Sequence, residues 1–145
     1  MTVVPMQERH LAALAEIEKV CFHAPWSADM LREELGKGLF LVAERDGVAV
    51  GYVGCQTVLD EGYITNIAVA ESCRRKGLGR AMLGALIDHC RESGASFLTL
   101  EVRQSNAPAI ALYKSMGFLP EGRRKNFYRQ PTEDAILMTK RDLSL

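Results

Sequence analysis

The chain has 145 residues, of which 48% are hydrophobic and 25% are charged, as expected of a single globular domain. Its 18 basic residues balance its 18 acidic residues, which argues against binding to nucleic acid or an anionic membrane through overall charge. No hydrophobic run reaches membrane-spanning length, and the N-terminus lacks the pattern of a signal peptide. We therefore expect one cytoplasmic domain, 1–145, that contacts neither nucleic acid nor membrane directly.

The four cysteines, Cys21, Cys55, Cys73 and Cys90, lie far apart in the sequence. They form no Cys-x-x-Cys pair, and no histidine stands beside them at the spacing of a zinc site. The pattern favours free thiols in a reducing compartment and no bound metal.

The first seventy residues predict two helices followed by an antiparallel meander. Leu11, Leu14 and Ile17 recur at helical spacing, and Ser27 is a good N-cap for a second, shorter helix. Asp46-Gly47 between two apolar runs is a strong hairpin signal. The expected elements are helices at 7–20 and 27–35 and strands at 40–45, 48–58 and 63–69.

The turn that follows, Arg74-Arg75-Lys76-Gly77-Leu78-Gly79-Arg80, opens a third helix and predicts an anion site. Glycines let the backbone approach a ligand closely, and the first N–H groups of a helix have no partner within it. The helix dipole and the cations favour a phosphate or pyrophosphate, although solvated basic residues at an ordinary helix start are the alternative. A Walker-type loop is excluded because Arg80 and Ala81 follow Gly79, and a dinucleotide fingerprint would need a third glycine where Met82 stands.

The second half of the chain predicts a crossover connection. The third helix, to about residue 93, separates strand 63–69 from a strand at 97–102, and strands joined in this way are usually parallel. A helix at 107–116 and strands at 118–123 and 135–140 follow, with a polar loop between the last two. The order predicts an α+β fold, a mixed and mostly antiparallel sheet flanked by helices. A doubly wound fold is excluded, because it would begin with its βαβ unit and not with roughly sixty residues of hairpins.

Two segments resemble the signatures of one family. Arg74-x-x-Gly77-x-Gly79 is similar to the Gln/Arg-x-x-Gly-x-Gly/Ala motif of GNAT acetyltransferases, and Asn106 to Phe118 resembles their Asn-x-x-Ala-x-x-Leu-Tyr-x-x-x-Gly-Phe segment. Both occur in the order and at the separation that the family shows. Four further segments resemble the bacterial branch that acetylates the N-terminal alanine of a small-subunit ribosomal protein. They are Phe22-x-x-Pro25-Trp26-Ser27, Asn66-Ile67-Ala68-Val69, Leu100-Glu101-Val102-Arg103 and Glu133-Asp134-Ala135-Ile136-Leu137-Met138.

The resemblance implies acetyl-CoA as co-substrate, the N-terminal segment of a ribosomal protein as partner, and a central parallel strand pair splayed around acetyl-CoA. It implies Glu101 as proton acceptor and Tyr113 as proton donor. The cofactor contacts that it implies are backbone groups of Ile67, Ala68 and Val69, a pyrophosphate grip of Arg75, Lys76, Gly77, Leu78, Gly79 and Arg80, and Asn106. The oligomeric state is open, with a monomer as one alternative.

These roles agree with the chemistry of acetyl transfer to an amine. An α-amino group with a pKa of ~8 is partly neutral at pH 7, whereas a lysine at ~10.4 is almost wholly charged. Glu101, near a strand end and partly shielded by apolar neighbours, could accept the proton of the amine. For the oxyanion we expect a backbone N–H freed by a bulge in strand 63–69, that of Val69. Without the motifs, Glu101 would be interpreted as a solvated glutamate and Tyr113 as a core aromatic.

The sequence says less about the acceptor. Its expected contacts are Phe22, Pro25 and Trp26, the turn Asp60-Glu61-Gly62, and Asn126-Phe127-Tyr128. The alternatives are acetylation of a small amine or an internal lysine, and a CoA-binding regulatory module without turnover. The presence of both Glu101 and Tyr113 argues against the regulatory module, because a sensor needs only the pyrophosphate loop.

Overall fold

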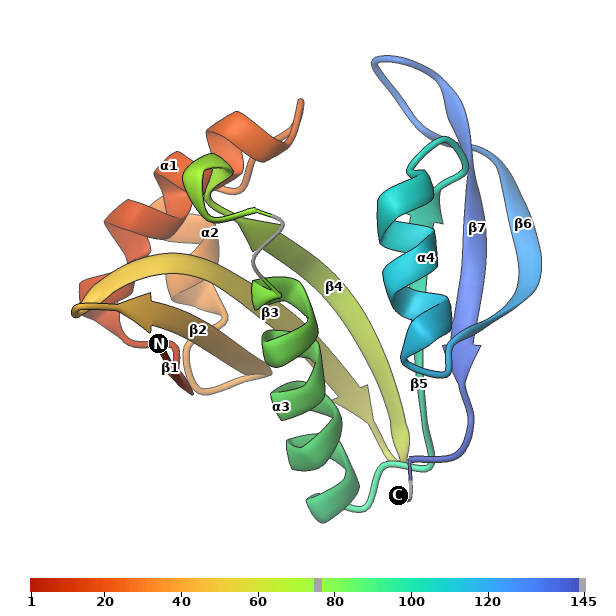
Figure 1. The fold of residues 1–145 in the computed structure, drawn as a ribbon, viewed down its shortest axis with the longest axis horizontal. Helices are drawn as coiled ribbons and strands as arrows, with labels where there is room; N and C mark the ends of the chain where they lie inside the picture. The colour runs from red at the N-terminus through yellow and green to blue at the C-terminus, as the bar shows by residue number, and fades with distance from the viewer. Residues whose placement is uncertain (75–76, 144–145) are drawn as a thin grey trace.

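The computed structural model describes residues 1–74 and 77–143, which form one mixed seven-stranded sheet with helices on both faces (Figure 1). The strand order across the sheet is β1-β2-β3-β4-β5-β7-β6. The strands are β1 (Thr2–Pro5), β2 (Leu39–Arg45), β3 (Val48–Val58), β4 (Glu61–Val69), β5 (Phe97–Arg103), β6 (Leu119–Tyr128) and β7 (Glu133–Lys140).

Four α-helices and two 3-10 turns lie within the described residues. They are η1 (Glu8–His10), α1 (Leu11–Cys21), α2 (Ala28–Glu33), η2 (Glu71–Cys73), α3 (Leu78–Glu92) and α4 (Ala107–Ser115). None of these described helices is long and apolar enough to cross a membrane.

The feature that positions the site is the junction of β4 and β5. These two strands are parallel, as predicted, but they pair only over Glu61–Tyr63 and Phe97–Thr99. Figure 1 shows them meeting at one end and splaying apart toward the other. Every other neighbouring pair in the sheet is antiparallel. The splay therefore opens the middle of the sheet, between β1–β4 on one side and β5–β7 on the other.

The two faces of the sheet bury separate cores, because successive strand residues point to opposite sides. In β2, Leu41 and Ala43 pack into the core that α3 covers, whereas Phe40 and Val42 pack into the core that α1 and α2 cover. Apolar burial on both faces is the main driving force that holds the helices against the sheet.

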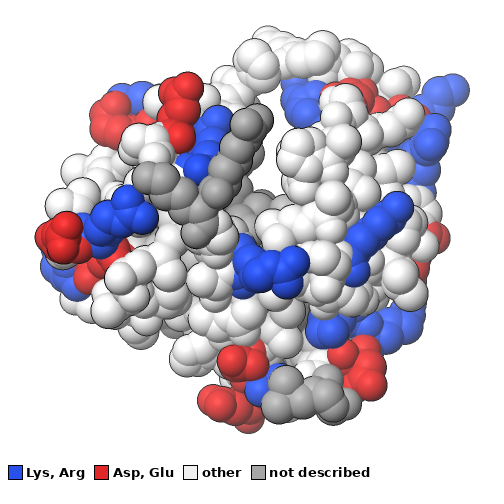
Figure 2. Space-filling model, viewed as in Figure 1, with Lys and Arg blue, Asp and Glu red and all other residues white. Residues whose placement is uncertain are grey.

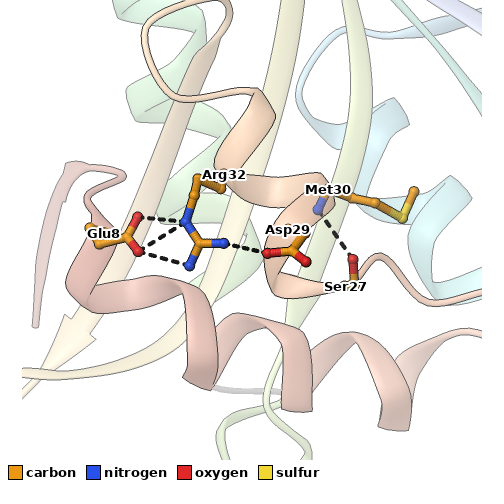
Figure 3. A network of polar contacts seen from close by, with 5 residues as sticks. All are labelled: Glu8, Ser27, Asp29, Met30 and Arg32. Atoms are coloured by element: carbon orange, nitrogen blue, oxygen red, sulfur yellow. Dashed lines mark hydrogen bonds and ion pairs between the residues drawn. The ribbon is translucent and has the colours of Figure 1, made fainter.

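Helix α2 is short, and polar contacts at its surface fix its position. The Oγ of Ser27 caps it by accepting the Met30 N–H at 3.1 Å. Arg32 donates to Glu8 through Nε at 3.0 Å and Nη2 at 2.8 Å, and to Asp29 through Nη1 (Figure 3). Exposed ion pairs contribute only about 0–1 kcal/mol each. The network therefore fixes the position of α2 relative to η1, but it adds little to the stability of the fold.

The structure departs from the sequence expectations at both edges of the sheet. Strand β1 was not predicted, and β6 continues to Tyr128 where a polar loop was expected. All of β6 before Tyr128 is exposed. An edge strand without a buried face lacks the alternation of apolar and polar residues that reveals a strand in sequence. The first predicted helix divides into η1 and α1, and α2 ends at Glu33.

Candidate active site

A cavity of about 640 Å³ opens where β4 and β5 splay apart, and Figure 2 shows the molecule hollowed at this place. Strand β4 contributes Asn66 and Ile67 to its lining, β5 contributes Glu101, and α4 contributes Tyr113. The connection after α1 and the turn between β6 and β7 also line it. The structure thus brings the predicted base and the predicted acid to one cavity.

Glu101 lies in β5, two residues before its end, and its side chain is only 5% exposed. Its Oε1 accepts a hydrogen bond from the Tyr63 hydroxyl, and its Oε2 lies 2.9 Å from Nε of Arg124. Tyr63 belongs to β4 and Arg124 to β6, so the carboxylate is held from both sides of the splay. Burial, followed by the hydrogen bond to Glu101, raises the pKa of Tyr63, which keeps this phenol a donor at neutral pH.

Tyr113 is buried in α4, with its ring centroid 6.0 Å from that of Phe118. Burial, with a smaller effect from nearby Tyr128, raises the pKa of Tyr113 to about 12. The phenol therefore keeps its proton throughout the neutral range. Its hydroxyl forms no hydrogen bond with any described residue, so the donor is free for a group in the cavity.

The edge of β4 that faces the splay presents backbone groups. The Ala70 N–H donates to the Val50 carbonyl of β3 at 2.8 Å, so Ala68 also faces β3, and Ile67 and Val69 face the opposite edge. That edge has lost β5 as a partner, since the two strands pair only as far as Tyr63. Of the three predicted backbone contacts, Ile67 and Val69 therefore face the opening, whereas Ala68 is directed into the sheet.

The predicted bulge in β4 exists, but it lies four residues before Val69. Gly54 pairs with Asn66 and Cys55 pairs with Ile64, so Thr65 is the extra residue. The bulge therefore does not lie at Val69 itself. The divergence of β5 exposes the Val69 N–H instead, and the Val69 carbonyl on the same edge accepts from Nε of Arg74 at 3.3 Å.

The N-terminus of α3 is open. Gly77 precedes it with φ 76°, a left-handed conformation that glycine adopts without strain. The Gly77 carbonyl accepts the first helical hydrogen bond, from Ala81, at 3.1 Å. Among the described residues, the N–H groups of Leu78, Gly79 and Arg80 have no helical partner, and no side chain caps them. An anion placed there would meet three donors and the positive end of the helix dipole.

The remaining residues of the pyrophosphate prediction divide into two groups. Arg75 and Lys76 lie outside the described residues. Arg80 donates from Nη2 to the Ser115 Oγ at 2.6 Å, which links α3 to α4. A Cβ at Gly79 would lie 3.3 Å from Cδ2 of Leu112, so this glycine also lets the two helices approach closely.

Asn106 is both the N-cap of α4 and part of the cavity lining. Its Oδ1 accepts the Ala109 N–H at 3.3 Å, which leaves its Nδ2 as the group that could reach a ligand.

The residues predicted to contact the acceptor lie only partly at the cavity. Four of them line the cavity, namely Phe22, Trp26, Phe127 and Tyr128, and Pro25 and Asn126 are sequence neighbours of these. The turn Asp60-Glu61-Gly62 does not line it, and its prediction is wrong. The turn lies at the closed end of the splay, where Glu61 pairs with Phe97 and the Asp60 carboxylate accepts from Ser96 at 2.6 Å.

Four residues of the cavity region were not assigned a role from sequence: Tyr63, Arg124, Glu18 and Asn66. Each of them has its polar partner on an element distant in sequence, so no pattern of residue spacing along the chain could have identified its role. Tyr63 and Arg124 meet only through Glu101, and Glu18 of α1 reaches the Tyr52 hydroxyl of β3 at 2.7 Å.

The four cysteines carry free thiols. No group of three or more His, Cys, Asp or Glu side chains is placed to hold a metal ion in residues 1–74 and 77–143.

A free set of helix N–H donors, an unpaired strand edge, and a carboxylate and a phenol in one cavity together define a site for acyl transfer from a coenzyme. The Acetyltransferase (GNAT) family model matches residues 11–118. The chain belongs to the GNAT acetyltransferase family.

Individual relatives show to which members of the family the chain is similar. The chain is 40% identical over 142 residues to the [ribosomal protein bS18]-alanine N-acetyltransferase of Escherichia coli K12, covering 94% of this chain and 95% of that protein. It is 39% identical over 129 residues to the Haemophilus influenzae enzyme of the same name, covering 86% and 88%. The crystal structure of the Escherichia coli ribosomal-protein-S18-alanine N-acetyltransferase superposes with a TM-score of 0.90 at 37% identity, over 99% of this chain and 96% of that one. Ard1 from Thermoplasma volcanium superposes with a TM-score of 0.86 at 25% identity, over 99% and 98%. The predicted α+β fold and the family resemblance are both confirmed.

Proposed function

We propose that the protein transfers the acetyl group of acetyl-CoA to the amine of the N-terminal alanine of ribosomal protein bS18. Identity of about 40% along nearly the full length to enzymes that carry this name supports the proposal. The structural observation that carries it is the placement of Glu101 and Tyr113 in one cavity beside the unpaired edge of β4.

Acetyl-CoA fits the open groups of this chain. The N–H donors of Leu78, Gly79 and Arg80 suit a pyrophosphate, and the free edge of β4 suits an extended chain bearing amides. Arg75, Lys76 and the Nδ2 of Asn106 would add contacts. When bound, acetyl-CoA supplies an activated thioester, and the remaining work falls to the side chains of this protein.

Glu101 is the proposed base. An ammonium cannot attack a thioester, so the α-amine must first lose a proton, and its pKa of ~8 makes that loss easy near neutral pH. The Glu101 carboxylate accepts the proton, directly or through a water, while Tyr63 and Arg124 hold its two oxygens. The carboxylate is nearly buried, so its position is defined before the substrate arrives.

The negative charge that develops next is met by one donor on each side of the splay. The Val69 N–H, on the free edge of β4, is the proposed donor to the oxyanion. Tyr113 is the proposed donor to the departing sulfur. A thiol has a pKa near ~8.5 and Tyr113 one of about 12, so full proton transfer from this phenol is uphill. Hydrogen-bond donation as the thiolate leaves is the part of the role that these two pKa values favour.

We further propose that the enzyme works in the cytoplasm, where its four free thiols stay reduced and where ribosomal proteins are made. Its partner is the N-terminal segment of bS18, without a direct contact to nucleic acid or membrane, and without a metal. A monomer contains every residue that the mechanism uses.

The test measures acetyl-CoA turnover with peptides that differ only in their first residue, beside polyamines and lysine peptides with blocked N-termini. We expect the alanine peptide to react fastest, with mass spectrometry placing the acetyl group on its α-amine. Faster turnover of polyamines or of blocked lysine peptides would contradict the proposal. CoA binding without turnover of any acceptor would instead indicate a regulatory module.

A further inference from the structure

Glu18 of α1 is a buried carboxylate in the wall of the cavity, 1% exposed. Its Oε1 accepts the backbone N–H of Trp26 at 2.8 Å, and its Oε2 accepts the Tyr52 hydroxyl at 2.7 Å. No described residue forms an ion pair with it. A buried carboxylate is costly unless its oxygens are satisfied, and here two donors from different elements satisfy them. Glu18 therefore links three elements that surround the acceptor side of the cavity.

One of these links fixes the connection between α1 and α2. The Trp26 ring lies 6.3 Å from the ring of Phe40, which stacks at 6.2 Å on Tyr52. Phe22 and Trp26 both line the cavity. The position of this wall thus depends on the Trp26 N–H that Glu18 accepts.

The other link continues to β4. Tyr52 is fully buried, its hydroxyl donates to Glu18, and the side chain of Asn66 lies close enough to the same phenol to influence its pKa. Since the Tyr52 proton is given to Glu18, the phenol oxygen is left as an acceptor, and Nδ2 is the group that Asn66 has to offer it. Burial, followed by the charge of Glu18, raises the pKa of Tyr52, so this phenol keeps its proton in the neutral range. By keeping the Tyr52 oxygen an acceptor, Glu18 favours the orientation of Asn66 that turns Nδ2 toward Tyr52 and Oδ1 away from it.

That orientation leaves one acceptor unused. The Asn66 Oδ1 is the buried side-chain atom in the described part of the chain that has no hydrogen-bond partner. Buried acceptors are almost always paired, and leaving one unpaired costs stability. Asn66 lines the cavity, so the occupant of the cavity is the group that can supply the missing donor. A peptide N-terminus carries such donors on its amine and on its first peptide N–H.

We propose that Glu18 is a positioning residue for the acceptor peptide. It fixes the connection that carries Trp26 and, through Tyr52, orients Asn66 so that Oδ1 accepts a hydrogen bond from an N–H at the peptide N-terminus. This inference rests on the proposed function, because it requires a peptide N-terminus in the cavity.

The test compares steady-state KM values for an alanine-first peptide and for acetyl-CoA, together with thermal unfolding, in Glu18→Gln, Tyr52→Phe and Asn66→Ala. Asn66→Ala removes the acceptor without a change in α1, and it should raise the peptide KM about 3- to 10-fold, the effect of one hydrogen bond. Tyr52→Phe should raise it by no more than Asn66→Ala does, because Tyr52 acts through Asn66. Glu18→Gln should raise it at least as much as Tyr52→Phe, because Glu18 also accepts the Trp26 N–H. The KM for acetyl-CoA should stay unchanged in all three.

Glu44 provides the matched control. Its carboxylate is also buried, it contacts the His10 Nε2 and lies 2.6 Å from the Arg9 Nη1, and it is not part of the cavity lining. Glu44→Gln should lower the unfolding temperature as Glu18→Gln does, but it should leave the peptide KM at the wild-type value.

The double variant Tyr52→Phe/Asn66→Ala separates the linked account from two independent effects. If Tyr52 acts through Asn66, the double variant should have the peptide KM of Asn66→Ala alone. Three results would each overturn the inference. The first is a double variant whose rise in peptide KM equals the product of the two single rises, and the second is an unchanged peptide KM in Asn66→Ala. The third is an equal change in peptide KM for Glu18→Gln and Glu44→Gln. A wild-type protein that does not acetylate the alanine peptide would overturn the proposed function, and this inference with it.

Discussion

The two helices beside the splay, α3 and α4, begin in opposite ways. Helix α3 follows Gly77, and no described side chain caps its first N–H groups. Helix α4 begins at Asn106, whose side chain accepts the Ala109 N–H, and its first turn contains Pro108, which has no N–H to offer. Only α3 therefore presents a full set of free donors to an anion, although both helix starts belong to family motifs.

This difference indicates that the two sides of the opening have different functions, one in binding acetyl-CoA and the other in the reaction. The α3 side offers uncapped N–H groups that suit a pyrophosphate, whereas the β5–α4 side carries Glu101 and Tyr113. Changes on the α3 side should weaken acetyl-CoA binding, and changes on the β5–α4 side should slow turnover at nearly constant affinity.

The largest effect is expected for Glu101→Gln. The amide keeps the shape of the side chain but cannot accept a proton, so turnover at pH 7 should fall about 10²- to 10⁴-fold. The loss should shrink above pH ~8, because the α-amine then arrives already neutral. Initial rates across pH, with isothermal titration of acetyl-CoA, measure both quantities.

Glu121→Gln is a suitable control for this variant, since Glu121 pairs with Arg141 at 2.6 Å outside the cavity. Wild-type turnover of Glu101→Gln at neutral pH would mean that the proton leaves by another route. A pH-independent loss with weaker acetyl-CoA binding would mark Glu101 as structural.

Gly79→Asp should have the next largest effect, on affinity. It places a negative charge at the free N–H groups of α3, and the loss of charge-assisted hydrogen bonds should weaken acetyl-CoA binding by about 100-fold or more. Ala107→Asp makes the same change at the first residue of α4 and should leave the affinity nearly unchanged. An acidic residue in a first turn is favourable for a helix, and a Cβ at Gly79 requires only a small shift of the Leu112 side chain, so both variants should fold. If Ala107→Asp weakened acetyl-CoA binding more than Gly79→Asp does, the pyrophosphate would have to be assigned to α4 and not to α3.

Tyr113→Phe should lower kcat about 10- to 100-fold, because one hydrogen bond to a developing charge is worth about 1.5–3 kcal/mol. The dissociation constant of acetyl-CoA should change little, since the bond forms only as the thiolate leaves. Single-turnover rates and titrations measure the two separately. Equal losses in kcat and affinity would show that Tyr113 binds or packs instead.

The raised pKa of Tyr113 also predicts how stability depends on alkaline pH. The pKa is about 12 in the folded protein and ~10 when unfolded, so the protective effect is complete below pH ~10 and is lost as pH rises toward 12. Over this window the wild type should lose about 2–3 kcal/mol more free energy of unfolding than Tyr113→Phe. Denaturant unfolding of both proteins at pH 9 to 12 measures it, and parallel curves would contradict the burial of the phenol.

The smallest effect is expected at Asn106. Asn106→Asp keeps the oxygen that caps α4 but loses Nδ2, so acetyl-CoA affinity should fall a few-fold while the unfolding temperature holds. Asn106→Ala should lose both properties, with about 1 kcal/mol of stability removed with the cap. If Asn106→Asp binds acetyl-CoA with the affinity of the wild type, the role of Asn106 is limited to capping α4.

The sequence predicts the parts of this fold that local chemistry decides. The hairpin at Asp46-Gly47 forms because both residues adopt positive φ, 53° and 78°. The parallel pair β4–β5 follows from the crossover helix, and Gly77 takes the left-handed conformation at the start of α3.

The parts that sequence did not reveal depend on contacts between distant elements. The Glu101 carboxylate meets Tyr63 and Arg124 only after β4, β5 and β6 come together. The turn at 60–62 was wrongly predicted to contact the acceptor. Only one end of β4 faces the cavity, and the point at which β5 diverges decides which end that is. Burial of Glu18 is likewise invisible in an amphipathic helix pattern.

The most direct test of the division between α3 and the β5–α4 side is a crystal structure of the protein with acetyl-CoA. We predict the pyrophosphate on the N–H groups of Leu78, Gly79 and Arg80, the thioester beside the free edge of β4, and the Tyr113 hydroxyl within hydrogen-bond distance of the sulfur. A pyrophosphate at the start of α4, or a thioester sulfur out of reach of Tyr113, would contradict the account.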